Sequence, residues 1–252
     1  MNLLLFESHE LAGSLLKLTG RRAEHIIRVL ELGRDDTVKV GMLNGKTGIA
    51  RVVGISGDTV DLDVHLTETV PDEPAIELIL ALPRPIMLQR ILKQATVLGV
   101  RRFHLIRSSR VQKSFFQASL LQPDKMKEIL MQGLEQTVDT RLPEVCVHHR
   151  FLPFVEDVVP ALTPACRLLA HPPSAATLPD LYAADRIFAG FVLAIGPEGG
   201  WSPHEVDSFG RQGFNPFSMG RRILHVDTAV VALLSQLRLL LELNASRKKI
   251  TG

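Results

Sequence analysis

The fold of this chain is decided by residues 191–200, which read FVLAIGPEGG. Five consecutive apolar residues predict a buried strand, and the turn after it contains three glycines, a proline and Glu198. Glycine has no Cβ, so a ligand can approach the main-chain N–H and C=O groups of such a turn closely. Ligands of open α/β sheets bind at the carboxyl ends of strands, where this turn lies. We therefore expect residues 196–200, the ligand loop, to bind a ligand.

The ligand loop is followed at once by a helix start. Residues 202–205, Ser-Pro-His-Glu, form a capping box with proline at the first helical position. Because this box fixes the helix start, the loop is predicted to be a short and stiff strand-to-helix turn.

Alternating strand and helix patterns surround the ligand loop. Strands are predicted at 76–82, 103–106 and 167–170, and helices at 86–98 and after Pro123. This alternation is typical of an α/β domain with a parallel sheet covered on both faces. A second short apolar run is predicted to end at Met219-Gly220. The last helix is expected over about 228–243, with Asp227 as N-cap. Its apolar face, broadened by Leu239 and Leu240, indicates a buried helix or half of a dimer interface.

The first 70 residues have a different pattern. Short alternating runs at 37–40, 48–53 and 59–64 predict strands, and residues 21–32 predict one helix with Ile26, Ile27 and Leu30 on one face. Short strands with one helix indicate a small β-barrel. Pro71-Asp72-Glu73-Pro74 is the predicted boundary, which gives domains of residues 1–72 and 73–252.

Composition limits the class of protein. With 46% apolar and 22% charged residues, the chain is expected to be a soluble protein with a core. Two cysteines, Cys146 and Cys166, favour a reducing compartment. Cys146 lies near His148 and His149, but no second ligand pair at zinc spacing exists. We therefore expect a core thiol, strand-edge histidines and no metal. Without a signal peptide or an apolar run of membrane length, the expected location is the cytoplasm.

The charge is unevenly distributed. Residues 84–113 contain basic residues and no acid, which is typical of a surface for a polyanion or of a solvated helix face. The basic residues are Arg84, Arg90, Lys93, Arg101, Arg102, Arg107, Arg110 and Lys113.

The ligand loop does not match the common phosphate-binding motifs. It lacks the Lys-Ser/Thr of a Walker loop and the glycine spacing of a dinucleotide fingerprint. A tight turn without a ligand is the alternative. A ligand site is favoured by the second strand end, which leads into RRILHVDTA at residues 221–229.

These two motifs resemble the RsmE family of 16S ribosomal RNA (uracil-N3) methyltransferases, of the SPOUT class. The family pattern is IGPEGG-(W/L)S-x-x-E, followed by LG-x-R-(I/V)-L-x-x-(D/E)-T-A. The resemblance covers most of the chain and includes a PUA-like N-terminal domain. Its other matching positions are His25, Arg28, Val29, Leu30, Asn44-Gly45, Lys93-Gln94-Ala95-Thr96, Leu98-Gly99-Val100, Glu135-Gln136, Arg141, Pro143 and His171-Pro172.

The resemblance implies an S-adenosyl-L-methionine-dependent enzyme that methylates N3 of a uridine in 16S ribosomal RNA or the small ribosomal subunit. It further implies a homodimer with a C-terminal trefoil knot, a topology that only the family match supports. Three strand ends are then expected to hold the cofactor. The implied cofactor residues are Ala170, His171, Pro172, Ile195, Gly196, Glu198, Gly199, Gly200, Ser218, Met219, Gly220, Leu224 and Thr228.

The resemblance also implies the residues that act on substrate. Arg222 is expected to hold the substrate and offset the charge of the uracil anion, and Glu198 is either a base or a partner of the sulfonium, unless it only caps the helix. The implied RNA-binding residues are Arg28, Lys93, Arg107, Arg110, Lys113 and Arg141, whose phosphate contacts would weaken at high salt.

Several positions depart from the family pattern. Arg221 replaces proline, His225-Val226-Asp227 replaces Arg-Thr-Glu, Val97 replaces glutamate, and Arg84-Pro85-Ile86 replaces a Lys-Gly-rich turn. The basic start of the PUA-like domain is also absent. These changes spare the cofactor loop more than the RNA side. Three alternatives therefore stay open: a SPOUT methyltransferase on another RNA site, a non-catalytic RNA-binding relative, and a generic nucleotide-binding α/β enzyme.

Overall fold

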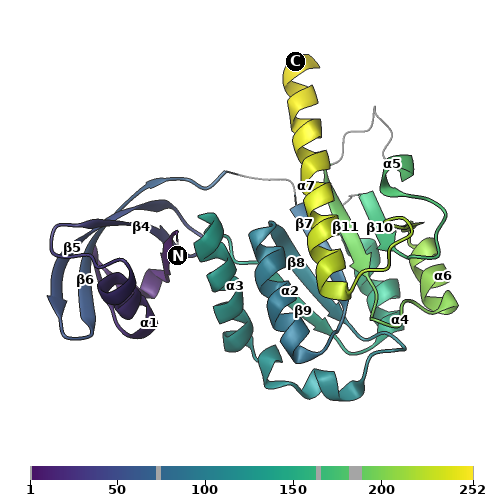
Figure 1. The fold of residues 1–252 in the computed structure, drawn as a ribbon, viewed down its shortest axis with the longest axis horizontal. Helices are drawn as coiled ribbons and strands as arrows, with labels where there is room; N and C mark the ends of the chain where they lie inside the picture. Colours follow the sequence, from purple (N-terminus) through teal and green to yellow (C-terminus); the bar gives the residue numbers. More distant parts are fainter. Residues whose placement is uncertain (1, 72–74, 163–165, 182–188, 252) are drawn as a thin grey trace. The chain divides into compact units, whose positions relative to one another are not determined.

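The computed structural model describes residues 2–71, 75–162, 166–181 and 189–251, and side chains up to residue 246. The chain divides into two compact units (Figure 1). The first comprises Met1–Asp72 with Leu130–Leu142, and the second comprises Glu73–Ile129 with Pro143–Gly252. Of the predicted boundary, only Pro71 lies among the described residues.

The first unit is built on a six-stranded mixed sheet in the order β1-β4-β5-β6-β3-β2. β1 runs parallel to β4, and the other neighbours are antiparallel. Within the described residues this sheet has β1 and β2 as its edges and curls into a half-barrel, which agrees with the small β-barrel that the pattern predicted. The strands are β1 (Leu4–Phe6), β2 (Leu11–Ala12), β3 (Leu15–Leu18), β4 (Thr37–Met42), β5 (Thr47–Ser56) and β6 (Thr59–Glu68).

The helical part of the first unit packs on this sheet. A short 3-10 turn, η1 (Ser8–Glu10), lies between β1 and β2. Further along the chain, α1 (Gly20–Glu24) continues as the π-helical turn η2 (His25–Val29). The helix predicted over residues 21–32 therefore ends at Val29, three residues before the predicted end. Ile26 is fully buried in the core, but Leu30 is 36% exposed, because it lies beyond the last helical turn. The end of α3 (Pro123–Thr137) completes the unit: Leu134 packs on Leu3 and Leu5.

The second unit contains a six-stranded sheet in the order β12-β10-β11-β7-β8-β9, and every neighbouring pair is parallel. All six residues of β11 are buried, as expected for a central parallel strand. The predicted α/β class is thus confirmed. The strands are β7 (Ala75–Ala81), β8 (Val100–Ile106), β9 (Glu144–His148), β10 (Cys166–Ala170), β11 (Gly190–Ile195) and β12 (Asn215–Phe217).

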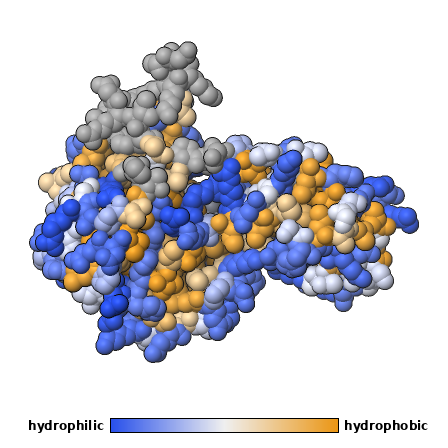
Figure 2. Space-filling model, turned by 180° about the vertical axis from the view of Figure 1, so that it is seen from behind, coloured by the Kyte–Doolittle hydropathy of each residue, from blue (hydrophilic) through white to orange (hydrophobic). Residues whose placement is uncertain are grey.

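Helices connect these strands, and α2 and α7 pack directly against each other (Figure 1). No helix of the described residues is long and apolar enough to cross a membrane. Hydrophobic and hydrophilic residues are interspersed over the face shown in Figure 2. The helices are α2 (Pro85–Val97), α3 (Pro123–Thr137), α4 (Phe151–Pro153), α5 (Leu178–Leu181), α6 (Pro203–Arg211) and α7 (Val226–Thr251), with short turns η3 (Lys113–Gln117), η4 (Ser119–Leu121), η5 (Phe154–Val158) and η6 (Val159–Ala161).

Three predicted boundaries of α7 and β12 were wrong. α7 begins at Val226, so Asp227 lies in its first turn rather than at the N-cap, and the helix continues to Thr251 instead of ending near 243. Asp227 is held there by Arg90 of α2, whose Nη1 lies 3.5 Å from its carboxylate. β12 ends at Phe217, two residues before the predicted strand end, because the chain turns away from β10 after this pairing.

Candidate functional site at the carboxyl ends of the strands

The sheet register brings the three predicted cofactor segments together. Ala170 at the end of β10 is paired with Ile195 of β11 on one side and with Phe217 of β12 on the other. Beyond the strands, the main-chain N–H of His171 donates to Phe217 O at 2.8 Å, and Ser218 N–H donates to Ala176 O at 2.8 Å. Segments separated by more than twenty residues in sequence thus form one continuous edge of the sheet.

The ligand loop is a tight turn that requires glycine at two positions. Gly200 N–H donates to Pro197 O at 2.7 Å, and Gly200 has φ +72°, a left-handed conformation that side chains disfavour. A Cβ on Gly196 would lie 3.1 Å from the ring of Trp201, which is itself 4% exposed. The main chain of this loop is therefore held in one conformation, as predicted from its glycines and proline.

The predicted capping box is confirmed, and it has a further partner. Ser202 N–H donates to Glu205 Oε2 at 2.8 Å, and Glu205 N–H donates to Ser202 Oγ at 3.3 Å. The other carboxylate oxygen, Oε1, accepts the main-chain N–H of Ser109 at 2.7 Å. Glu205 is 2% exposed. This one buried side chain therefore joins the loop after β8 to the start of α6, a contact that sequence reasoning missed.

Arg110 supports the ligand loop from the same segment. Its Nη1 donates to the carbonyl oxygen of Gly199, and lies 3.4 Å from that of Gly200. The sequence predicted Arg110 as an RNA-binding residue. The structure assigns part of its guanidinium to the loop; because the group carries five N–H donors, a phosphate contact by the others stays a prediction.

The loops around Arg110 and Glu198 enclose a small cavity of about 170 Å³. Exposed Glu198, Arg84 and Arg110 supply its charges, and Phe115 supplies an aromatic wall. Its lining residues are Leu82, Pro83, Arg84, Arg110, Val111, Gln112, Phe115, Pro197, Glu198 and Gly199. An apolar wall with both charge signs at the mouth suits a flat polar ring.

A second, larger cavity of about 560 Å³ lies beside α7. It brings Ser218, Met219 and Gly220 next to Leu239 and Leu240, so these two leucines line the cavity while the rest of the apolar face of α7 is buried in the core. Leu239 is 55% exposed. The other lining residues are Thr177, Leu178, Pro179, Gln236 and Leu243.

His171 carries one of the unsatisfied buried polar atoms near this edge, and Trp201 Nε1, directly after the ligand loop, is another. The Nδ1 of His171 is buried and makes no hydrogen bond within the described residues. Burial lowers the pKa of His171, which favours the neutral ring. A buried polar atom without a partner costs about 1–3 kcal/mol, so this nitrogen is suited to hydrogen-bond a ligand.

The remaining predicted residues are spread around this edge. Arg222, Pro172 and Thr228 are exposed, and Leu224 is half-buried. Arg222 lines neither of the two cavities described above.

The predicted RNA-binding residues differ in their freedom to bind. Lys93 and Lys113 are exposed, and Arg107 is half-buried. Arg28 forms an exposed ion pair with Glu24 at 3.0 Å in the first unit. Arg141 donates from Nη2 to Val70 O at 2.9 Å within the same unit, which gives it a structural role. Part of the basic block is also paired with acids from other segments, since Arg90 contacts Asp227 and Arg102 contacts Glu144 at 2.8 Å.

Cys146 is not the buried core thiol that the sequence predicted. Cys146 is half-buried on β9, the edge strand, and its thiol donates to Glu144 Oε1 at 3.3 Å. Burial raises the pKa of the thiol to about 11, helped by Glu144. Burial also lowers the pKa of His148 to about 4, together with the nearby His104 and His149, so the His148 ring is neutral at physiological pH.

The domain that contains the parallel sheet and its glycine-rich edge matches the family model described as an RNA methyltransferase domain, over residues 71–238. The chain belongs to the ribosomal RNA small subunit methyltransferase E family, as the sequence resemblance predicted. It is 33% identical over 238 residues to the member from Treponema pallidum (strain Nichols), covering 92% of this chain and 88% of that protein. It is 30% identical over 231 residues to the member from Synechocystis sp. (strain ATCC 27184 / PCC 6803 / Kazusa), covering 89% and 73%.

A solved structure agrees with the fold. The ribosomal RNA small subunit methyltransferase E from Neisseria gonorrhoeae, bound to S-adenosyl methionine, superposes with a TM-score of 0.75 at 20% identity, covering 94% of this chain and 98% of that chain. The similarity extends over both units of the present protein.

Proposed function

We propose that this protein transfers the methyl group of S-adenosyl-L-methionine to N3 of a uridine in small-subunit, 16S ribosomal RNA. The observation that carries the proposal is the joining of the three cofactor segments at one sheet edge, where Ala170 lies between Ile195 and Phe217. Membership of the ribosomal RNA small subunit methyltransferase E family supports the same activity.

The residues at this edge fit the cofactor. The main chain of the ligand loop and the unsatisfied Nδ1 of His171 supply hydrogen-bonding groups for an adenine edge, and Ile195 and Met219 supply apolar surface for its ring. Bound there, the cofactor supplies an electrophilic methyl group. The residues proposed to hold it are the thirteen named from the family resemblance, from Ala170 to Thr228.

The cavity beside the ligand loop is proposed to take the uracil ring. Phe115 would stack on the ring, while Arg84 and Arg110 would lie near its carbonyl oxygens. Uracil N3 carries a proton at neutral pH, which it must lose when the new N–C bond forms. Glu198 on the cavity wall is proposed to accept that proton. Arg222, which does not line this cavity, is proposed from the family resemblance to offset the developing charge on the ring.

The functional form is proposed to be a homodimer with a trefoil-knotted C-terminal region. Ile223, Leu239 and Leu243 expose apolar side chains on and near α7, at 84%, 55% and 43%. Apolar surface of this kind on a helix is commonly covered by a second subunit. RNA contacts are proposed for Arg28, Lys93, Arg107, Arg110, Lys113 and Arg141, and the cytoplasm is the expected location.

The test is methyl transfer to 16S ribosomal RNA and to small subunits from cells that lack the modification. We expect incorporation of labelled methyl at one uridine, and a stop in reverse transcription there because an N3 methyl blocks the pairing edge. Methylation at another atom or on other RNA would instead identify a different SPOUT activity. RNA binding without cofactor binding would contradict the proposal and favour the non-catalytic alternative.

Arg222→Ala is expected to abolish turnover while calorimetry finds S-adenosyl-L-methionine binding nearly unchanged. Arg221→Ala is the matched control. Arg221 is exposed, directly precedes Arg222 and departs from the family pattern, so this variant is expected to keep turnover. Equal loss of turnover and cofactor binding in Arg222→Ala would show a structural role. Gly199→Val is expected to weaken cofactor binding, since a Cβ there would lie 3.0 Å from Arg110 Cδ.

A further inference from the structure

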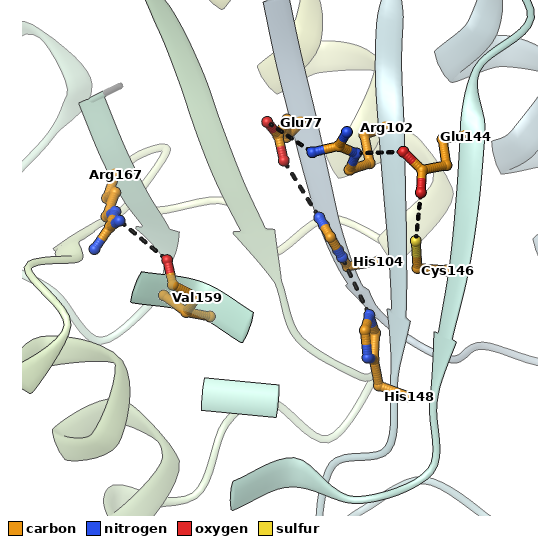
Figure 3. Close-up of polar contacts among 8 residues, drawn as sticks. All are labelled: Glu77, Arg102, His104, Glu144, Cys146, His148, Val159 and Arg167. Carbon is orange, nitrogen blue, oxygen red and sulfur yellow. Dashed lines mark hydrogen bonds and ion pairs between the residues drawn. The ribbon is translucent and has the colours of Figure 1, made fainter. Parts of the chain in front are cut away.

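A cluster of polar side chains lies on one face of the sheet, across β7, β8 and β9 (Figure 3). The register pairs Arg102 with Glu144 and His104 with Cys146, so side chains two residues apart on each strand point to the same face. We call this group the polar cluster; it consists of Glu77, Arg102, His104, Glu144, Cys146 and His148. It is separate from the ligand loop and is not used by the proposed methyl transfer.

Three members of the polar cluster direct metal-ligating atoms at one point. His104 Nδ1 lies 3.1 Å from His148 Nε2. One ring nitrogen of each histidine and Cys146 Sγ all lie within 4.8 Å of one another. Tetrahedral zinc with Zn–N of about 2.0–2.1 Å and Zn–S of about 2.3 Å places its ligand atoms roughly 3.3–3.7 Å apart, so small side-chain rotations complete such a site.

Glu77 orients the first of these ligands. Its Oε2 lies 3.3 Å from His104 Nε2, and the two residues are 5% and 2% exposed. A carboxylate beside Nε2 keeps the proton on that nitrogen, which leaves the lone pair of Nδ1 directed toward His148. Metal-binding histidines almost always donate their other ring N–H to such a group.

The charges of the polar cluster favour a cation. Glu77 and Glu144 are two acids, and both contact the single cation Arg102, at 3.7 Å and 2.8 Å. The two carboxylates of the cluster therefore outnumber its one guanidinium, and a metal-bound Cys146 thiolate would add a further negative charge. A divalent ion would balance that charge beside Glu77, the one buried carboxylate of the cluster.

We propose that His104 Nδ1, Cys146 Sγ and His148 Nε2 bind a divalent transition-metal ion of the zinc type. Nitrogen and sulfur ligands select such an ion over magnesium or calcium. The thiol proton leaves to solvent when Sγ coordinates, and its hydrogen bond to Glu144 Oε1 is lost. Because β9 is the edge strand, the ion would tie it to β8. The sequence did not show this site, since His104 comes from a separate strand.

The test is metal titration of the full chain after treatment with a chelator. Cobalt(II) is the spectroscopic probe, and zinc(II) is measured by competition with a chromophoric chelator. We expect one equivalent of tight binding, the intense visible bands of tetrahedral cobalt, and a thiolate-to-cobalt charge-transfer band. Cys146→Ser should remove the charge-transfer band, and both Cys146→Ser and His148→Ala should weaken zinc binding at least about tenfold.

Matched controls lie close by in the chain. Cys166→Ser and His149→Ala change the same residue types outside the polar cluster and are expected to bind as the wild type does. Glu77→Gln should weaken zinc binding by roughly 10–100-fold without changing the cobalt ligand set.

Binding that is absent, or that is equal in wild type and Cys146→Ser, would overturn the proposal and leave the polar cluster as a hydrogen-bonded network. Circular dichroism of each metal-free variant checks its fold. Should His148→Ala unfold, the isosteric Cys146→Ser decides the outcome.

Discussion

Glu205→Gln tests whether one buried carboxylate holds the functional edge together. The carboxylate accepts two main-chain N–H groups, from Ser109 at 2.7 Å and Ser202 at 2.8 Å. A carboxamide has one acceptor oxygen, so it keeps one of these bonds and turns its NH2 group toward the other donor. Loss of one charge-assisted hydrogen bond in a buried site gives an expected destabilisation of about 2–4 kcal/mol.

Urea unfolding followed by fluorescence measures this change. The chain has a single tryptophan, Trp201, which is 4% exposed and directly precedes the capping box. Its emission therefore reports the unfolding of the segment that Glu205 stabilises. Glu156→Gln is the matched control, because this carboxylate is exposed on η5 in the same unit and its change is expected to stay within about 0.5 kcal/mol.

A midpoint for Glu205→Gln that coincides with the Glu156→Gln control would refute the reasoning. It would mean that the two N–H groups find water or other acceptors at no cost. Ser202→Ala separates the two parts of the contact. It removes only the hydroxyl that accepts Glu205 N–H at 3.3 Å, and its expected cost is about 0.5–2 kcal/mol.

Three further predictions concern the loop, the first unit and the RNA surface. Gly200→Ala should destabilise the protein by about 1–2 kcal/mol, because φ is +72°, whereas Gly210→Ala, with open space around its Cβ, should not; equal urea midpoints would contradict this. Burial raises the pKa of Glu10, but the hydrogen bond from Arg22 and other contacts outweigh it, so the net pKa lies below 4.5. The stabilisation is then present above about pH 4.5 and lost as pH falls through the lowered pKa. Glu10→Gln should flatten this acid dependence in circular dichroism, and an unchanged profile would exclude the pair as its cause. Lys113→Gln should reduce the slope of log affinity for single-stranded RNA against log salt by roughly 0.7, and an unchanged slope would remove Lys113 from the phosphate contacts.

The sequence by itself determined the locally encoded features, such as the buried strand before the ligand loop, the tight turn of the loop and the start of α6. Apolar runs, the capping box at 202–205 and the glycines of 196–200 act over a few neighbouring residues, so their effects are visible in the local pattern. The predicted α6 start was confirmed for this reason. Predictions that needed a partner from elsewhere fared less well, as at Asp227, whose carboxylate is placed by Arg90 of another helix.

Tertiary structure decided which residues meet. The strands of the second unit are ordered β12-β10-β11-β7-β8-β9, which is not their order in the chain. A two-residue period shows which side chains share a face of one strand, but it carries no information on the neighbouring strand or its register. The contact of Glu205 with Ser109, the support of the ligand loop by Arg110, and the meeting of His104 with Cys146 and His148 all depend on that pairing. Only the folded sheet, through its order and register, could assemble them.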